Sequence, residues 1–220
     1  MAFGSALITS ASLVYFDFET LPPFVIEKLP VRFETLFLAA LRIHVASAAL
    51  AFPLCLISML HFIQRRPSWH RRFGWLAGVT VLFALVPSGV VLAFDAKGGA
   101  LVTAGFLLSA LLVTAGMLAG IRAARRRDFV VHRRAMRHVV AQMSVAVTSR
   151  ALILALDLAG VDPDVAYVLA LWLPVLGSAA AAELLSLPRR LSLKGTRREN
   201  SALAALFRPV RVRLVARAGR

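Results

Sequence analysis

Five long runs of apolar residues constrain this chain more than any other feature. A helix rises about 1.5 Å per residue, so about 20 apolar residues cross the roughly 30 Å hydrocarbon core of a bilayer. The predicted spans are residues 37–62, 75–94, 100–121, 136–158 and 165–187. The sequence therefore predicts an all-α, polytopic integral membrane helix bundle.

The distribution of charge supports the same fold class. Of the 26 Lys and Arg residues, 21 lie in three segments, 65–72, 122–137 and 189–220, and most of the 11 acids lie in or beside the alternate connections. This positive-inside pattern predicts that the three basic segments and the C-terminus are cytoplasmic. The net charge of +15 thus indicates membrane topology and contact with anionic lipid headgroups, and no nucleic-acid partner is expected.

Three regions follow from these patterns. Residues 1–36 are predicted to hold an N-terminal apolar segment and an outer-face loop, residues 37–187 the membrane bundle, and residues 188–220 a basic cytoplasmic tail. Residues 3–16 are apolar but short, and they form either a possible short sixth membrane helix or an interfacial segment. The single cysteine, Cys55, lies in an apolar run and is expected to fill core space.

An arginine lies inside the fourth apolar run. Arg150 would cost on the order of 3 kcal/mol or more in the membrane unless it faced the bundle. His132 precedes it by eighteen residues, or five helical turns, so both are expected on one helix face, with Met136, Met143 and Asp157 on or near it. Two interpretations stay open. Arg150 pairs with Asp157 or caps carbonyls of a neighbouring helix, or it holds an anionic or polar ligand.

The histidines suggest cofactor chemistry. His70 and His132 stand at matching places before the second and fourth spans, and two such side chains on facing helices could be the axial ligands of a haem b. The simpler alternative is that they snorkel into the headgroups or cap helix starts. His44 lies in the opposite half, at a depth comparable with Arg150, so these two could line a polar pocket or quinone site. Glu183 is expected to neutralise an Arg or His of the basic end, most simply as a structural ion pair.

A weak internal repeat connects the two histidine segments. The HRR triplet at 70–72 is followed by Asp95, and the HRR triplet at 132–134 by Asp157, each aspartate 25 residues after its histidine. Seven identities in 26 aligned positions suggest two parallel units. In this register Ser88 occupies the place that Arg150 takes in the second unit.

Several segments, in this order and spacing, resemble a family. RIHVASAALAFPLCL, WHRRFGWLAG, KGGALVTAGFLLSALLVTAGMLAG, VHRRAMRHVVAQMSVAVTSRALI and LWLPVLGSAAAAEL are similar to the bacterial predicted membrane proteins known only as domain of unknown function 2306. The resemblance covers about residues 37–187 and implies a multi-pass protein of the bacterial inner membrane. The chain departs from the pattern at Ala135, where an aromatic residue is expected before Met136, and at Ser178, which stands near a family asparagine. The resemblance carries no catalytic assignment.

Three functions remain in competition. The first is a membrane redox or redox-assembly protein that holds haem or quinone through His70 and His132 or through His44 and Arg150. The second is a transporter or binder of a small anionic or lipid ligand at His44 and Arg150. The third is an accessory membrane subunit without chemistry.

Overall fold

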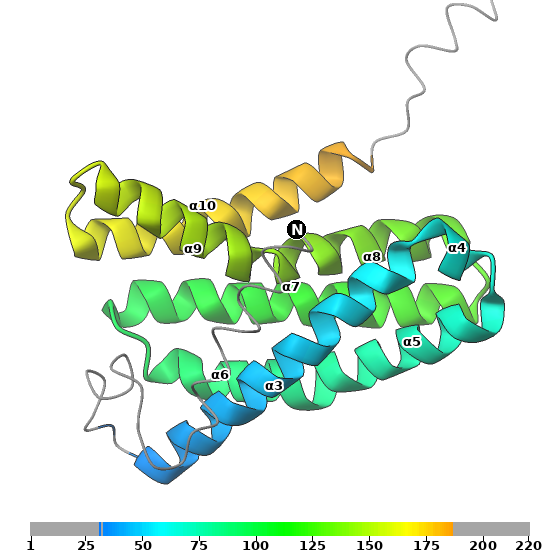
Figure 1. The fold of residues 1–220 in the computed structure, drawn as a ribbon, viewed down its shortest axis with the longest axis horizontal. Helices are drawn as coiled ribbons and strands as arrows, with labels where there is room; N and C mark the ends of the chain where they lie inside the picture. The colour runs from blue at the N-terminus through cyan, green and yellow to red at the C-terminus, as the bar shows by residue number, and fades with distance from the viewer. Residues whose placement is uncertain (1–30, 32, 187–220) are drawn as a thin grey trace, which may run out of the picture. The chain divides into compact units, whose positions relative to one another are not determined.

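The computed structural model describes residue 31 and residues 33–186 (Figure 1). The predicted N-terminal segment at 3–16, the loop that follows it and the basic tail lie outside the described residues, so their predictions stay untested.

Every element of the described part of the chain is a helix. The elements are α3 (Glu34–Met59), α4 (His61–Gln64), α5 (Pro67–Thr80), the π-helical turn η2 (Val81–Leu85), α6 (Val86–Phe94), α7 (Gly99–Arg125), α8 (Phe129–Met143), α9 (Val145–Leu158) and α10 (Pro163–Leu184). They make five spans long and apolar enough to cross a membrane, with Pro67–Phe94 and Phe129–Leu158 each counted as one span. The predicted all-α membrane bundle is confirmed.

All five spans begin before the predicted residue, and the third also extends beyond its predicted end. The second span begins at Pro67 rather than at residue 75, because proline at the first helical position loses no hydrogen bond. The fifth begins at Pro163, where the Asp162 carboxylate accepts hydrogen bonds from the backbone N–H groups of Asp164 and Val165. The third continues to Arg125. His70 therefore lies in a helix and not in a loop.

The first span ends sooner than predicted. Leu60 has an extended backbone conformation, which separates α3 from the short α4 that begins at His61. The Gln64 side chain donates a hydrogen bond to the Met59 carbonyl across this break, at 2.9 Å. His61 is thus not part of the membrane helix that was predicted to end at residue 62.

The fourth span is interrupted, although the sequence predicted one continuous helix from Met136 to Leu158. The break lies at Ser144, whose hydroxyl donates to the Ala141 carbonyl at 2.6 Å. Thr148 in turn donates to the Ser144 carbonyl at 3.1 Å. Hydroxyls that bond to their own helix in this way bend it. The prediction that His132 and Arg150 share one helix face assumed an unbroken helix, and it stays a prediction.

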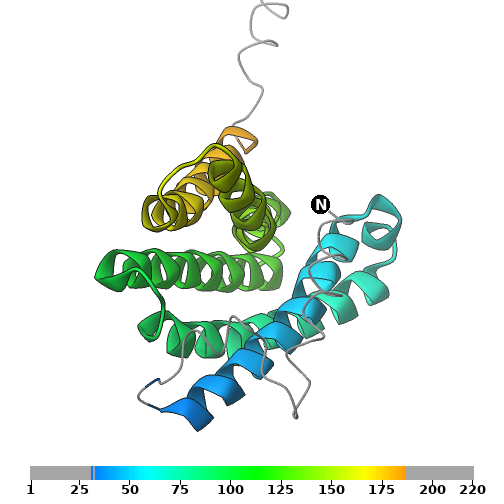
Figure 2. The same ribbon diagram turned by 60° about the vertical axis from the view of Figure 1, so that its left-hand side comes forward.

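The helices pack mostly against their neighbours in the chain. α3 lies along α5, η2 and α6, α7 lies against α6 and α8, and α10 covers α7, α8 and α9 (Figures 1 and 2). The buried core has two clusters, one joining α3, α5, η2, α7 and α8, and one joining α7, α9 and α10. Cys55 is buried in the first cluster, as predicted.

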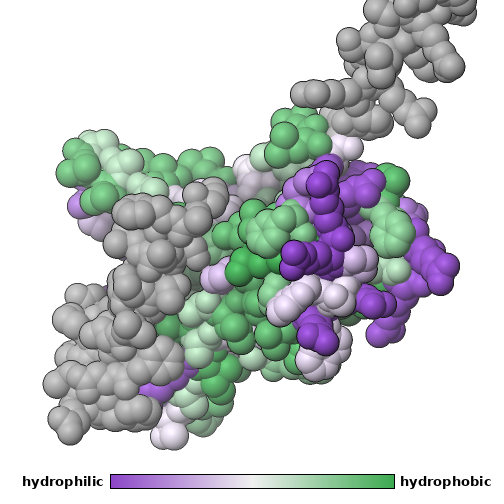
Figure 3. All heavy atoms as spheres, turned by 45° about the vertical axis from the view of Figure 1, so that its right-hand side comes forward, coloured by the Kyte–Doolittle hydropathy of each residue, from purple (hydrophilic) through white to green (hydrophobic). Residues whose placement is uncertain are grey.

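Hydrophilic side chains gather at one end of the bundle. We call the region formed by α4, the start of α5, the end of α7 and the start of α8 the basic end, because its connections carry segments 65–72 and 122–137. Figure 3 shows hydrophilic side chains concentrated on one part of the visible face and hydrophobic ones over much of the rest. This separation is typical of a protein whose flank faces lipid.

Candidate functional site

His70 and His132 occupy equivalent places in two helices. Each is the fourth residue of its helix, and its backbone N–H donates to the residue before that helix, Arg66 or Asp128, at 3.1 and 3.0 Å. Both helices start at the basic end. The sequence placed the two histidines at matching depth, and the fold brings them together.

The two imidazole rings are direct neighbours. Their centroids are 6.2 Å apart, and their planes are almost perpendicular, at 86°. A metal–imidazole bond is about 2 Å long, so two rings on opposite sides of one metal ion would have centroids roughly 6 Å apart. The separation of the rings is compatible with two ligands of a single ion, and it is also that of two rings packed edge to face.

The hydrogen bonds of the pair fix the tautomer of one ring. The Nδ1 of His132 lies 2.9 Å from the carbonyl oxygen of Gly120, and a carbonyl can only accept, so Nδ1 carries the proton and Nε2 has a free lone pair. The Nδ1 of His70 is buried and makes no hydrogen bond within the described residues, although the backbone of Ser58 lies beside the ring. Such an orphaned nitrogen is unusual in a protein interior.

No cluster of three or more His, Cys, Asp or Glu side chains suited to a metal ion occurs in the described part of the chain. A tetrahedral zinc site needs three or four protein ligands. A six-coordinate haem needs only two, because the porphyrin supplies the other four. The donor set thus fits haem better than a bare metal ion.

A second polar region lies deep in the opposite half of the bundle. The Nδ1 of His44, on α3, donates to the carbonyl oxygen of Leu85 at 3.2 Å and lies 3.4 Å from the hydroxyl of Ser88. Leu85 ends the π-helical turn, a local distortion frequent at functional sites. Gly89 leaves room for the ring, since a Cβ there would be 3.0 Å from His44 Cε1.

Arg150 lies beside this region. Its guanidinium is close enough to the imidazole of His44 and to the phenol of Tyr167 for its charge to act on both. Its only hydrogen bond within the described residues runs from Nη1 to the Ala146 carbonyl of its own helix, at 2.8 Å. The predicted pair with Asp157 does not form. Both side chains are exposed, with no ion pair between them.

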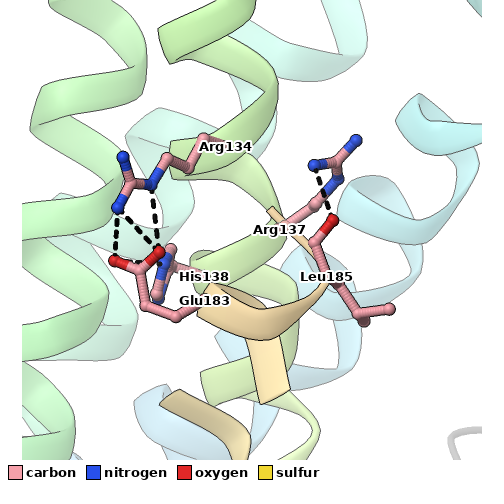
Figure 4. A network of polar contacts seen from close by, with 5 residues as sticks. All are labelled: Arg134, Arg137, His138, Glu183 and Leu185. Carbon is pink, nitrogen blue, oxygen red and sulfur yellow. Dashed lines mark hydrogen bonds and ion pairs between the residues drawn. The ribbon is translucent and has the colours of Figure 1, made fainter. Parts of the chain in front are cut away.

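Glu183 forms the ion pair expected of it. Its carboxylate accepts from Nη2 of Arg134 at 2.6 and 2.7 Å and from Nε at 3.1 Å, and the Nε2 of His138 lies 3.8 Å away (Figure 4). The Arg137 side chain donates to the Leu185 carbonyl nearby, at 3.4 Å. These contacts join α8 to the end of α10 at an exposed position, which indicates a structural role.

Sequence reasoning missed two glycines and a buried amide. Gly116 and Gly120 of α7 form a GxxxG pair that lets α8 approach, and a Cβ at either would meet Val139 or Met136. That motif was visible in the sequence. Gln142 is buried and donates to the Val175 carbonyl and to Ser178, both at 2.9 Å. Its role depends on contacts with α10, which no local pattern reveals.

Comparison with known proteins identifies a family. The family described as "Predicted membrane protein (DUF2306)" matches residues 41–186. No curated protein and no solved structure matches the chain.

Proposed function

The chain belongs to the DUF2306 family of predicted membrane proteins, and we propose that it is a membrane redox protein holding one b-type haem between His70 and His132. The observation that carries this proposal is the 6.2 Å separation of the two imidazole centroids. Sixty-two residues separate these histidines in the chain, so their meeting is a property of the fold.

The surrounding residues support axial ligation. The Gly120 carbonyl orients the His132 ring and leaves Nε2 as an electron-pair donor, which is the usual second-shell arrangement of a ligating histidine. Arg71 and Arg133 directly follow the histidines and are exposed, so they suit ion pairs with two haem propionates.

A haem in this position would supply one-electron transfer. The protein would hold it, set its potential through the two imidazoles and the low-polarity core, and keep water from the iron. We propose no catalytic side chain, because none of the paired carboxylate, nucleophile or metal-protease patterns is present.

A visible spectrum tests the proposal. The protein is produced with haem supplementation, purified in detergent, and its dithionite-reduced and oxidised spectra are subtracted. We expect sharp α and Soret bands that are lost in His70→Ala and His132→Ala. His61→Ala is the matched control, since His61 lies at the same end and, within the described residues, makes no hydrogen bond or ring contact with the pair. Size-exclusion profiles establish that the variants fold.

Electron paramagnetic resonance adds a sharper readout. Perpendicular imidazole planes leave two iron d orbitals nearly degenerate, so the 86° angle predicts a highly anisotropic low-spin ferric signal rather than an ordinary rhombic one. Protein that stays free of haem under excess haem, or bands unchanged in both alanine variants, would refute the proposal.

We further infer that the basic end faces the cytoplasm of a bacterial inner membrane and that its arginines contact anionic headgroups. The support is the gathering of basic segments on connections that meet at one end. Single cysteines at Arg66 and Arg126, in a Cys55→Ser background, should be shielded from an impermeant thiol reagent in intact cells. A cysteine at Lys97 should react.

A further inference from the structure

The charge of Arg150 has no counter-ion in the described part of the chain. The residue lies eight positions before the end of the fourth span, or about 12 Å from that end of the helix. Its guanidinium has five N–H donors, and the described residues use one of them. An ionised side chain at such depth is costly unless something compensates it.

Snorkelling does not explain this arginine. A side chain that escapes to the nearer surface would point toward the end of α9 at Leu158. Arg150 instead bonds to the carbonyl of residue 146, four positions earlier, so its guanidinium points toward the middle of the membrane. His44 lies about 15 Å into α3 from the same side, within the range over which the Arg150 charge acts on its ring.

The neighbourhood combines donors with an apolar flank. The Nδ1 proton of His44 is bound to Leu85, so Nε2 accepts a hydrogen bond in the neutral ring and can donate one to an anion only once the ring is protonated. α3 and α9 do not pack along one another, and both carry exposed apolar side chains such as Ile43, Leu50 and Leu154. A ligand that is charged at one end and apolar along its length would suit this setting.

We propose that Arg150 and His44 bind the headgroup of an anionic amphiphile, a carboxylate or phosphate carried on an acyl chain. Two oxygens of the headgroup accept hydrogen bonds from unused N–H groups of the guanidinium, and the acyl chain lies along the apolar flank of α3 and α9. This site is independent of the histidine pair at the basic end.

Thermal unfolding of the full chain in an uncharged detergent tests the site. Oleate and phosphatidylglycerol should raise Tm. Oleyl alcohol, which has the same chain without the charge, and inorganic phosphate or acetate, which have the charge without the chain, should not. Stabilisation by phosphate equal to that by phosphatidylglycerol would overturn the acyl-chain part and leave a soluble anion as ligand.

Variants separate the site from general attraction to a basic protein. Arg150→Gln should weaken oleate binding about tenfold or more, as loss of a charge-assisted pair does. The oleate affinity of Arg150→Lys should lie between that of Arg150→Gln and that of the natural protein, because lysine keeps the charge but lacks the paired N–H donors of the guanidinium. His44→Ala should weaken binding by a smaller factor. Arg126→Gln, which changes an exposed arginine at the basic end, is the control and should bind normally.

Two results would overturn the proposal. The first is equal stabilisation of Arg150→Gln and the natural protein by oleate. The second concerns an internal counter-ion: if Asp17→Asn, Glu19→Gln and Glu27→Gln together cost the same lipid-free stability as Arg150→Gln, the compensating charge belongs to the chain itself. Both variants are compared only if their size-exclusion profiles match the natural protein.

Discussion

The two interrupted membrane helices, Pro67–Phe94 and Phe129–Leu158, are distorted at equivalent positions, but they carry different polar side chains beyond the distortion. His70 and His132 are 62 residues apart, and at the same offset the π-helical turn Val81–Leu85 corresponds to residues 143–147, which contain the break at Ser144. The structure thus gives the weak repeat a physical counterpart, since both helices are distorted at matching positions.

The same offset matches the polar groups beyond each distortion. Ser88 donates to the Ala84 carbonyl at 2.6 Å, and Arg150 donates to the equivalent Ala146 carbonyl at 2.8 Å. Ser88 is buried against α3, however, whereas Arg150 is exposed. Ser88 and Arg150 therefore donate the same kind of hydrogen bond within their own helices. Only Arg150 also carries a charge, and this hydrogen bond does not require one. That surplus charge is the basis for assigning Arg150 a ligand.

The largest effect is expected from exchanging these two residues. Ser88→Arg should raise the apparent free energy of membrane insertion of the 67–94 segment by about 2–3 kcal/mol, and Arg150→Ser should lower that of the 129–158 segment by about 2 kcal/mol. Glycosylation mapping of each segment in a host protein measures both. Equal insertion of the natural and exchanged segments would mean that Arg150 escapes to the headgroups, contrary to the direction of its bond to Ala146.

A buried amide gives the next largest contrast. Gln142 links α8 to α10, whereas its counterpart Thr80 makes no such link within the described residues. Gln142→Leu should lower the free energy of unfolding by about 1–2 kcal/mol, because it removes two interhelical hydrogen bonds in a low-dielectric interior. Thr80→Val should have much less effect. Titration with a denaturing detergent compares the two, and similar losses would mean that Gln142 acts through packing alone.

A glycine distinguishes the first helix in another way. Gly89→Ala should cost about 1 kcal/mol, because its Cβ would push the His44 ring away from the Leu85 carbonyl. Gly177→Ala is the control, since a Cβ there meets nothing within 4 Å, and it should be neutral or slightly stabilising. Differential scanning fluorimetry measures both. An unchanged Tm in Gly89→Ala would indicate that the ring moves without penalty.

These contrasts show which parts of the molecule the sequence could predict. The five spans followed from apolar runs, because bilayer thickness sets helix length whatever the tertiary contacts. The helix starts at Pro67 and Pro163 did not, since a hydropathy run ignores the prolines and caps that extend a helix into polar sequence. The break at Ser144 depends on hydroxyls that bond within the helix, and no periodicity records it.

The candidate sites divide in the same way. His70 and His132 could be paired from their matching places in two helices, because helices that start at the same surface bring equivalent residues to one depth. The placement of His44 against Leu85 required the π-helical turn, which sequence did not reveal. The Arg150–Asp157 pair was one of the interpretations left open, and it does not form because Arg150 bonds to the Ala146 carbonyl of its own helix.

The smallest effect is expected at the basic end, where the two helices use one arginine differently. Arg72 lies over the Trp69 ring of its own helix, 5.9 Å from the centroid, whereas its counterpart Arg134 pairs with Glu183 of α10.

Because the Arg134–Glu183 pair is exposed, water and salt screen it. Glu183→Gln should therefore lower Tm only slightly at low salt and hardly at all at high salt. Arg134→Gln should match it, and the double variant should be no worse than either single one, since both remove the same interaction. Arg72→Gln should show no such salt dependence. A large loss of Tm that persists at high salt would mean that lipid or the end of α10 shields the pair from water. The ion pair at the basic end would then help to hold α8 against α10.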